Sequence, residues 1–227
     1  MLGIIGAMKV ETDKLISALQ NKKTTKLAGA DFVQGTLHGK SVVVCQCGIG
    51  KVNSALMAAV MHSAFKVAAI INIGVAGGVA KGIKQGDIVI ADKVGQHDYD
   101  LTVFGAKLGQ IDGFSDVFFE CGKRIVDKLT ATAKKSGYKY FVGPIVSGDQ
   151  FINDTKFAND LNTNFGAIAC DMESGAIGHV CQLLGVPFAI MRAISDEGDD
   201  TALADYDRFL QEAAERSFEV IAGYLGK

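Results

Sequence analysis

Hydrophobic and polar positions along the chain follow two different periods. Short apolar runs bounded by glycine or polar turns predict strands, whereas apolar positions three and four residues apart predict helices. We expect strands at 2–5, 32–37, 41–46, 68–73, 87–91, 141–146, 168–170 and 188–194. We expect helices at 11–19, 52–65, 154–162, 173–184 and 204–225, and a long helix that Ser115 or Asp116 caps and that ends at Gly137.

Helices interspersed among the strands predict how the chain is organised. They indicate a largely parallel sheet covered on both faces, within one domain that spans 1–227. The sequence contains no repeat, low-complexity stretch or linker composition. In such sheets ligands bind at the carboxyl ends of the strands, so we expect functional residues at those ends.

The composition narrows the class of protein. The 227 residues are 48% hydrophobic and carry a formal net charge of −2, with lysine and arginine scattered along the chain. Such a chain can bury a full core, and the lack of a basic stripe argues against a nucleic-acid partner. The 27 glycines against 2 prolines indicate tight turns where the backbone approaches a ligand, as α/β enzymes require.

The cysteines and the apolar runs indicate a cytoplasmic protein. The five cysteines are an odd number and mostly lie in apolar runs, which is typical of buried free thiols in a reducing compartment. The apolar start, 1–8, is too short for a signal peptide and lacks a basic leader. No apolar run approaches the ~20 residues that a membrane span needs, so we expect no membrane partner.

Polar signals follow the early strands. Glu11 comes after the first strand and Gly6, on the first turn of the next helix, where an acidic residue can serve catalysis or merely complement the helix dipole. The loops 47–51 and 73–78 are glycine-containing connections after strands. Such loops can aim backbone N–H groups at a ligand, or can be only tight turns. Neither loop has the spacing of a P-loop.

The strongest local signal is a pair of acidic residues in an apolar stretch, Asp171 and Glu173. Burying two carboxylates is costly unless they are paired or used, and capping of the following helix accounts for only one of them. A later strand carries Arg192 and ends in Ser195 and Asp196, ahead of residues typical of a loop. There we favour function over helix capping.

Three further features of the sequence have simpler explanations than a functional site. Phe151 ends a polar turn after a strand; it could stack on a flat base, although an aromatic residue is more often core. The polar cluster of His97, Asp98 and Asp100, like the helix that contains His179 and Cys181, lacks zinc-like spacing, so we expect no metal and no cofactor. The absence of a G-x-S-x-G elbow argues against a serine hydrolase.

Seven motifs, in order, resemble those of the methylthioadenosine/S-adenosylhomocysteine nucleosidases, which belong to the nucleoside phosphorylase superfamily. They are G-I-I-G-A-M-x-x-E at 3–11, G-I-G-K-V at 48–52, G-x-A-G-G at 74–78, H-D-x-D at 97–100, S-G-D-x-F-I at 147–152, D-M-E at 171–173 and R-A-I-S-D at 192–196. The likeness covers essentially the whole chain, and the ordered set is far more specific than any one motif.

The resemblance implies a single three-layer α/β domain with a central mixed, mostly parallel twisted sheet flanked by helices, usually as a homodimer. It implies hydrolysis of the N-glycosidic bond of 5′-methylthioadenosine and S-adenosylhomocysteine, and also of 5′-deoxyadenosine. The products are adenine and the 5-thio-substituted ribose, as needed in methionine salvage and in the recycling of S-adenosylmethionine by-products. The partners it implies are a small nucleoside and water.

The resemblance also assigns roles to individual residues. Glu11 is the base that activates water, Glu173 holds the ribose hydroxyls, and Asp196 is the acid that protonates adenine N7. The expected substrate-binding residues are Phe151 stacking on adenine, the Ile152 backbone on the base edge, Met172 on the sugar, Ser195 holding Asp196, Arg192 near the water, Tyr206 near the 5′-thio group, Ile49, Ala76 and Gly77 from the two loops, and Leu101 and Phe104 reaching the neighbouring subunit's site. Val75 stands where family members often have serine.

This chemistry is consistent with the residue types. Two carboxyl groups on opposite sides of a glycosidic bond are the expected solution in inverting hydrolysis. Asp196 must be protonated, which burial and neighbouring acids favour, while Glu11 must be ionised to accept a proton from water. An ionised Glu173 can hold both ribose hydroxyls and stabilise the oxocarbenium-like sugar.

Three rival functions stay open at this point. A purine nucleoside phosphorylase needs cations around phosphate, yet 3–11, 47–53 and 74–78 contain no arginine, and Lys51 and Lys81 are typical of surface residues. A futalosine-type hydrolase would differ only in the pocket for the 5′ substituent. A non-catalytic nucleoside-binding protein should have lost at least one of the three acids, and all three are present.

Overall fold

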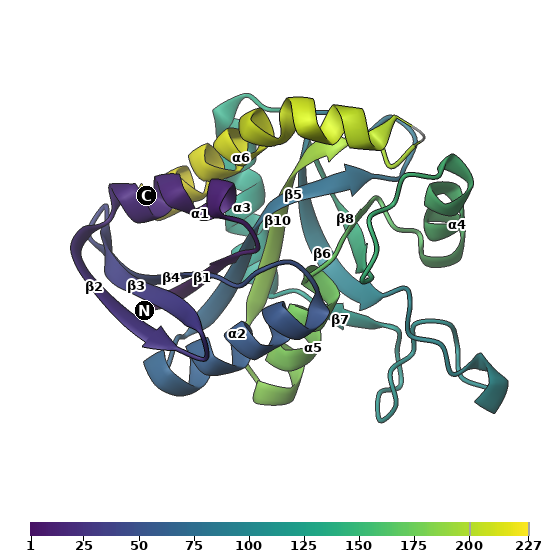
Figure 1. Cartoon of the computed structure of the whole chain (residues 1–227), viewed down its shortest axis with the longest axis horizontal. Helices are drawn as coiled ribbons and strands as arrows, with labels where there is room; N and C mark the ends of the chain where they lie inside the picture. Colours follow the sequence, from purple (N-terminus) through teal and green to yellow (C-terminus); the bar gives the residue numbers. More distant parts are fainter. Residues whose placement is uncertain (200, 227) are drawn as a thin grey trace.

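In the computed structural model, which describes residues 1–199 and 201–226, strands and helices alternate along most of the chain (Figure 1). The strands are β1 (Leu2–Gly6), β2 (Gln20–Leu27), β3 (Ala30–Leu37), β4 (Lys40–Gln46), β5 (Ala69–Gly78), β6 (Ile88–Gln96), β7 (Phe118–Glu120), β8 (Tyr140–Ser147), β9 (Ala169–Asp171) and β10 (Phe188–Asp196). The helices are α1 (Lys9–Ala18), α2 (Lys51–Phe65), the short η1 (Thr102–Phe104), α3 (Lys123–Ser136), α4 (Thr155–Phe165), α5 (Ser174–Leu184) and α6 (Ala202–Gly226).

The strands form one mixed sheet. Parallel pairing joins β4, β1, β5 and β10, and also joins β6, β8 and β9. Antiparallel pairing adds β3 and β2 at one edge, attaches β7 to β6, and joins the two parallel groups through β10–β6 and β5–β9. The mixed sheet predicted from the sequence is confirmed, with more antiparallel pairing than the strand–helix alternation alone indicates.

The register of the sheet brings several strand ends together. Asp196 at the end of β10 pairs with Gly77 of β5, and Gly77 in turn pairs with Cys170 of β9. Asp171, the last residue of β9, pairs with Ser147 at the end of β8. Residues that lie far apart in the sequence therefore meet at one place on the sheet.

Helices cover both faces of the sheet, as the sequence predicts. In Figure 1, α1, α3 and α6 pack on one side, and α2 and α5 pack together on the other. Between these layers lies a continuous apolar core in which β1, β5, β6 and β10 are almost completely buried. A smaller apolar cluster lies beneath α4. The site at the strand ends thus rests on a rigid, close-packed base.

Three elements, α3, β7 and β2, differ from the sequence-based expectation. The long helix does not begin at Ser115 or Asp116: α3 starts at Lys123, because the preceding residues form β7 along β6. Its end at Gly137 is confirmed by a left-handed backbone there, with φ of +81°. Local pattern does not predict β2, because this edge strand is mostly exposed and polar and lacks an apolar alternation.

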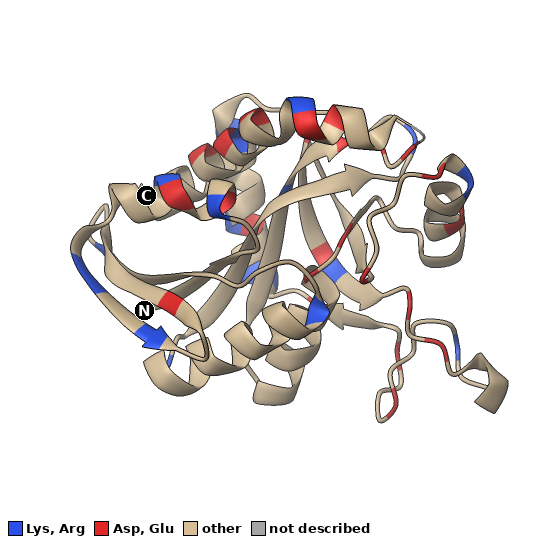
Figure 2. Cartoon of the chain, viewed as in Figure 1, with Lys and Arg blue, Asp and Glu red and all other residues tan. Residues whose placement is uncertain are grey.

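The segment between β6 and β7 projects from the body of the molecule and carries η1 near its tip (Figure 1). Figure 2 shows arginine interspersed with aspartate and glutamate along α6, while β2 carries several lysines. Within the described part of the chain, no helix combines the length and the apolar character needed to cross a bilayer.

Candidate active site

One pocket gathers most of the residues singled out from the sequence. Eleven of the fourteen candidates line it: Glu11, Ile49, Ala76, Gly77, Phe151, Ile152, Met172, Glu173, Ser195, Asp196 and Tyr206. The other lining residues are Ala7, Met8, Val75, Gln150, Cys170 and Asp171. Arg192, Leu101 and Phe104 do not line it. The prediction that strand ends would bring the acidic residues together is confirmed.

The Glu11 carboxylate is held by three backbone N–H groups. Oε2 accepts from Ala7 at 2.6 Å and from Met8 at 2.9 Å, and Oε1 accepts from Val75 at 3.0 Å. Ala7 and Met8 end the turn between β1 and α1, so the first turn of the helix directs Glu11 back toward the strand end. Burial raises the pKa of Glu11, while the Arg192 charge and these N–H donors oppose that rise.

Gly74 makes room for this carboxylate. Its φ of +152° lies in a region that favours glycine. A Cβ atom at this position would overlap Glu11 Oε1 and Arg192 Nη1. Only a glycine on β5 therefore lets the acid and the guanidinium lie against the backbone of the strand.

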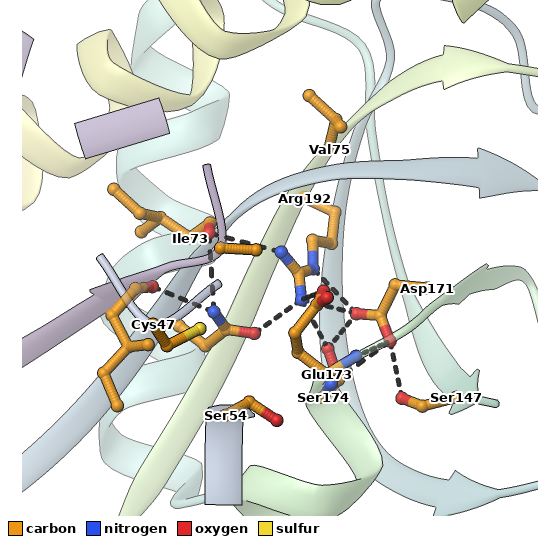
Figure 3. A network of polar contacts seen from close by, with 12 residues as sticks. Cys47, Ser54, Ile73, Val75, Ser147, Asp171, Glu173, Ser174 and Arg192 are labelled. Carbon is orange, nitrogen blue, oxygen red and sulfur yellow. Dashed lines mark hydrogen bonds and ion pairs between the residues drawn. The ribbon is translucent and has the colours of Figure 1, made fainter. Parts of the chain in front are cut away.

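A buried charge network forms the floor beside the pocket (Figure 3). The Arg192 side chain is fully buried and pairs with Asp171, with Nη2 2.6 Å and Nε 2.8 Å from Oδ2. It also donates to Asn72 Oδ1 at 2.6 Å and to the Ile73 carbonyl at 3.2 Å. Because a buried guanidinium needs paired charge and filled hydrogen bonds, these contacts fix Arg192 in one orientation.

Asp171 connects this network to the neighbouring loops (Figure 3). Its Oδ1 accepts the Ser147 hydroxyl at 2.5 Å and the N–H groups of Glu173 and Ser174 at 3.2 and 3.1 Å. Its other oxygen accepts the Ser174 hydroxyl as well as Arg192. Asp171 therefore ties the ends of β8 and β9 and the start of α5 to β10.

Glu173 lies at the start of α5, between this network and the pocket. Its Oε1 accepts the Gly50 N–H at 3.0 Å, and its Oε2 lies 3.3 Å from Arg192 Nη2. Burial and the nearby Asp171 charge raise the pKa of Glu173 to about 7, against the lowering effects of Arg192 and of the Gly50 N–H.

Asp196 ends β10 on the other side of the pocket. Its Oδ2 accepts the Ser195 hydroxyl at 2.8 Å, and its Oδ1 accepts the Gly198 N–H at 3.0 Å. Gly77 leaves space for it, because a Cβ there would lie 2.8 Å from Asp196 Oδ1. Burial raises the pKa of Asp196 even though both hydrogen bonds lower it, so the group is biased toward the protonated form that an acid catalyst needs.

Aromatic and apolar side chains also line the pocket and form a wall beside the acids. Phe151 and Tyr206 meet edge to face, with ring centroids 5.5 Å apart, and Phe151 is 41% exposed. The Tyr206 hydroxyl donates to Met8 Sδ at 3.0 Å. Ile152 is buried, and it packs in the cluster beneath α4. This wall presents flat aromatic faces and a thioether, which suit a base and an apolar substituent.

Some placements were not foreseen from the sequence. Arg192 lies beneath the site rather than facing its cavity, and Leu101 and Phe104 lie on the projecting segment. Asn72 was missed, although a lone amide within the apolar run 68–73 was a usable signal of a buried polar contact. The sequence singles out Asp171 as an unusual acid, but its partners come from β8, β10 and the start of α5, whose relative positions local pattern does not give.

Known proteins resemble this chain along almost its whole length. A family model described as the phosphorylase superfamily matches residues 1–226. The chain is 40% identical to a 5′-methylthioadenosine/S-adenosylhomocysteine nucleosidase from Actinobacillus succinogenes, over 100% of this chain and 98% of that protein.

Solved structures show the same fold. The nucleosidase of that name from Neisseria meningitidis, in complex with methylthio-immucillin-A, matches with a TM-score of 0.96 and 34% identity, over 99% of this chain and 98% of that chain. The futalosine hydrolase of Helicobacter pylori matches with a TM-score of 0.94 and 33% identity, over 98% and 96%. Enzymes with two different nucleoside substrates therefore share this architecture.

Proposed function

The chain belongs to the phosphorylase superfamily and, within it, to the 5′-methylthioadenosine/S-adenosylhomocysteine nucleosidases, and we propose on this basis that its pocket hydrolyses the N-glycosidic bond of these two nucleosides. The products are adenine and the 5-thio-substituted ribose. The observation that carries the proposal is the convergence of three buried carboxyl groups, those of Glu11, Glu173 and Asp196, on one pocket with an aromatic wall. The same pocket would accept 5′-deoxyadenosine.

Asp196 is placed for the acid step. Loss of adenine as an anion is unfavourable, so a proton delivered to N7 lowers the barrier. The raised pKa of Asp196, caused by its burial, keeps this proton available, and the Ser195 and Gly198 bonds hold the carboxyl group in place. Phe151 would stack on the departing base, and the Ile152 backbone would bond its edge.

Glu11 and Glu173 act on the sugar in this proposal. Glu11 accepts a proton from water as the water attacks the anomeric carbon, and its three N–H donors keep it aimed. Glu173 binds the ribose hydroxyls, with Met172 on the sugar, and its negative charge favours the oxocarbenium-like sugar of the transition state. Val75 supplies no hydroxyl, so the water depends on Glu11, Glu173 and the backbone.

The charge of the pocket favours water over phosphate as the nucleophile. Its described lining includes four acidic residues, Glu11, Asp171, Glu173 and Asp196, and no lysine or arginine. Arg192 is occupied by Asp171 and Glu173 and is fully buried. A phosphate dianion would meet repulsion here instead of the cationic or N–H-rich site that a phosphorylase requires.

Adenine release from 5′-methylthioadenosine, measured with and without phosphate and with the sugar product identified, tests this proposal. We expect equal rates in both buffers and free 5-methylthioribose as the product. A strict phosphate requirement with a sugar 1-phosphate product would instead identify a phosphorylase.

The similarity to the futalosine hydrolase of Helicobacter pylori raises the question of whether futalosine is also a substrate. Its hydrolysis would need only a different fit of the 5′ substituent. The lining residues Met8, Ile49 and Tyr206 are apolar or aromatic and favour a methylthio group, which binds by burial alone. We therefore expect a higher kcat/KM for methylthioadenosine than for futalosine in the same assay, and the reverse order would make futalosine hydrolysis the main activity.

We also propose a homodimer in which Leu101 and Phe104 reach the neighbouring subunit's pocket. Phe104 is 82% exposed on the projecting segment, and neither residue lines its own chain's pocket. Val52 and Leu56, one turn apart on α2, are 79% and 46% exposed and provide further apolar surface for a second copy. Location in the cytoplasm stays a proposal, supported by five free, buried cysteines.

Replacing Phe104 by aspartate tests the dimer. A charge placed in an apolar contact should weaken association or raise the KM for methylthioadenosine several-fold, since such contacts carry about 1–3 kcal/mol. Light scattering gives the mass, and steady-state kinetics give the KM. A comparison variant, Leu203→Asp, changes another exposed apolar residue. Wild-type mass and KM for Phe104→Asp would refute the shared site.

A further inference from the structure

Three loops meet beside the pocket around one lysine and two aspartates. Lys51 is the first residue of α2, Asp98 lies just after β6, and Asp149 lies just after β8. The Lys51 ammonium is 2.6 Å from Asp98 Oδ1, and these side chains are only 19% and 20% exposed. None of the three residues lines the pocket, so the proposed reaction leaves them without a role.

The three residues bond to one another in a closed triangle. The Asp149 N–H donates to Asp98 Oδ2 at 3.0 Å, and the Lys51 N–H donates to Asp149 Oδ1 at 2.8 Å. The ion pair between Lys51 and Asp98 is the third side. We refer to this arrangement as the Lys51–Asp98–Asp149 triangle. It joins the loops that follow the neighbouring strands β6 and β8 to the loop that follows β4, which lies elsewhere in the sheet.

The triangle differs from the ordinary ion pairs on the surface of this protein. Lys123 and Asp127, for example, are one helical turn apart, with 86% and 61% of their side chains exposed. Such pairs contribute little to stability or to geometry. In the triangle, by contrast, each aspartate also accepts a backbone N–H from another loop, so the loops themselves are fixed relative to one another.

One corner of the triangle controls the sugar side of the pocket. Gly50, directly before Lys51, donates its N–H to Glu173 Oε1 at 3.0 Å. Its φ of +100° is a backbone conformation that glycine adopts readily and other residues rarely do. A Cβ on Gly50 would lie 3.1 Å from Asp149 Oδ1, which shows how closely Asp149 packs on this turn. The positions of Asp149 and Lys51 therefore help to direct the Gly50 N–H toward Glu173.

Another corner controls the base side. Asp149 is followed directly by Gln150, Phe151 and Ile152, which all line the pocket. Its backbone N–H is bound to Asp98, which anchors the start of this loop. A nucleoside spans both sides at once, with its sugar at Glu173 and its base at Phe151. The distance between these two subsites thus depends on the triangle.

We infer that Lys51, Asp98 and Asp149 are positioning residues that align the sugar and base subsites for one nucleoside. They act through the Gly50 N–H on Glu173 and through the loop that begins at Gln150. The inference rests on the proposed function, since it assumes that a nucleoside occupies the pocket.

Replacing Lys51 by methionine, which keeps the length of the side chain and removes its charge, is the first test. We expect kcat/KM for methylthioadenosine to fall about ten- to a hundredfold, as misplacement of reacting groups by about 1 Å does. Inhibition by adenine alone, which needs only the base subsite, should change less than threefold. Lys123→Met, the matched control, should have wild-type values for both.

The pH dependence of kcat/KM gives a second, independent readout. The Gly50 N–H lowers the pKa of Glu173, so its loss should raise that pKa and move the acidic limb of the profile to higher pH. Arg192, Asp171 and Glu11 also face Glu173, but the substitution leaves them in place. A shift of the acidic limb of the kcat/KM profile to higher pH would therefore show that the hydrogen bond from the Gly50 N–H to Glu173 is weakened.

A pair of variants at Asp149 keeps the test decisive if Lys51→Met does not fold. Asp149→Asn retains an oxygen that accepts the Lys51 N–H and should keep most of the activity, whereas Asp149→Ala should resemble Lys51→Met. Wild-type kinetics for Lys51→Met or Asp149→Ala would overturn the inference. Equal losses for nucleoside and adenine, with an unmoved acidic limb, would also overturn it. A wild-type enzyme that releases no adenine would instead refute the proposed function.

Discussion

Asp196→Asn should release adenine from methylthioadenosine about a thousandfold more slowly than the wild type, while its affinity for the nucleoside changes little. The amide keeps the size of the side chain, its oxygen can still accept the Gly198 N–H, and its NH₂ group can donate to the Ser195 hydroxyl oxygen. It has no acidic proton to give to the base, and general acid catalysis typically contributes 10²–10⁴-fold. Single-turnover kinetics and direct binding of the nucleoside separate the two effects.

The leaving group provides a further check on Asp196. A thioriboside that releases 4-nitrophenolate needs no proton, so Asp196→Asn should cleave it at nearly the wild-type rate. Asp207→Asn, one residue beyond Tyr206 and exposed, is the matched control and should not affect either substrate. Wild-type turnover of methylthioadenosine by Asp196→Asn would refute the role of Asp196 as the acid that protonates adenine.

Glu11→Gln should show an equally large loss for a different reason. An amide cannot take a proton from water, so the rate should fall about 10³-fold or more for every substrate, including the 4-nitrophenyl thioriboside. The substitution should also lower the stability of the fold. Both Glu11 oxygens accept backbone N–H groups, and the NH₂ group of glutamine would face at least one of these donors. We therefore expect a loss of thermal stability as well, measured by calorimetry.

Two controls separate the chemistry from folding. Glu212→Gln makes the same change at an exposed residue of α6 and should have wild-type rates. A nucleoside bound to Glu11→Gln with normal affinity would show that the pocket is intact. If the variant instead hydrolyses methylthioadenosine at the wild-type rate, another group must activate the water.

The sequence predicted the acids of the site better than their supports. Glu11 and Glu173 follow strands and Asp196 ends one. In sheets with parallel strands such positions converge, so their meeting in one pocket could be expected. Arg192 could not be placed in this way. Whether a residue near the end of a strand points into the cavity or beneath it depends on register and on long-range partners such as Asn72, which local pattern does not encode.

The errors in the fold have similar causes. The polar residues Ser115 and Asp116 look like a helix start, but the short strand β7 forms because it can pair with β6. In the same way, β2 has no apolar alternation to reveal it and depends on β3 as its partner. Both are cases in which tertiary pairing overrides the local signal.

The buried pairing of Arg192 with Asp171 limits how this sequence can change over time. Removing Arg192 leaves Asp171 without its counterion, and removing Asp171 leaves Arg192 with Glu173, 3.3 Å away, as its one remaining partner carboxylate among the described residues. Breaking a buried pair in this way costs about 3–5 kcal/mol, against a total stability of about 5–15 kcal/mol for an ordinary domain. A viable path that loses one of them must replace both together. Ile49, Phe151 and Tyr206 line the pocket but take no part in this ion pair. New substrate preferences should therefore arise by single substitutions at these residues, while Arg192 and Asp171 stay unchanged.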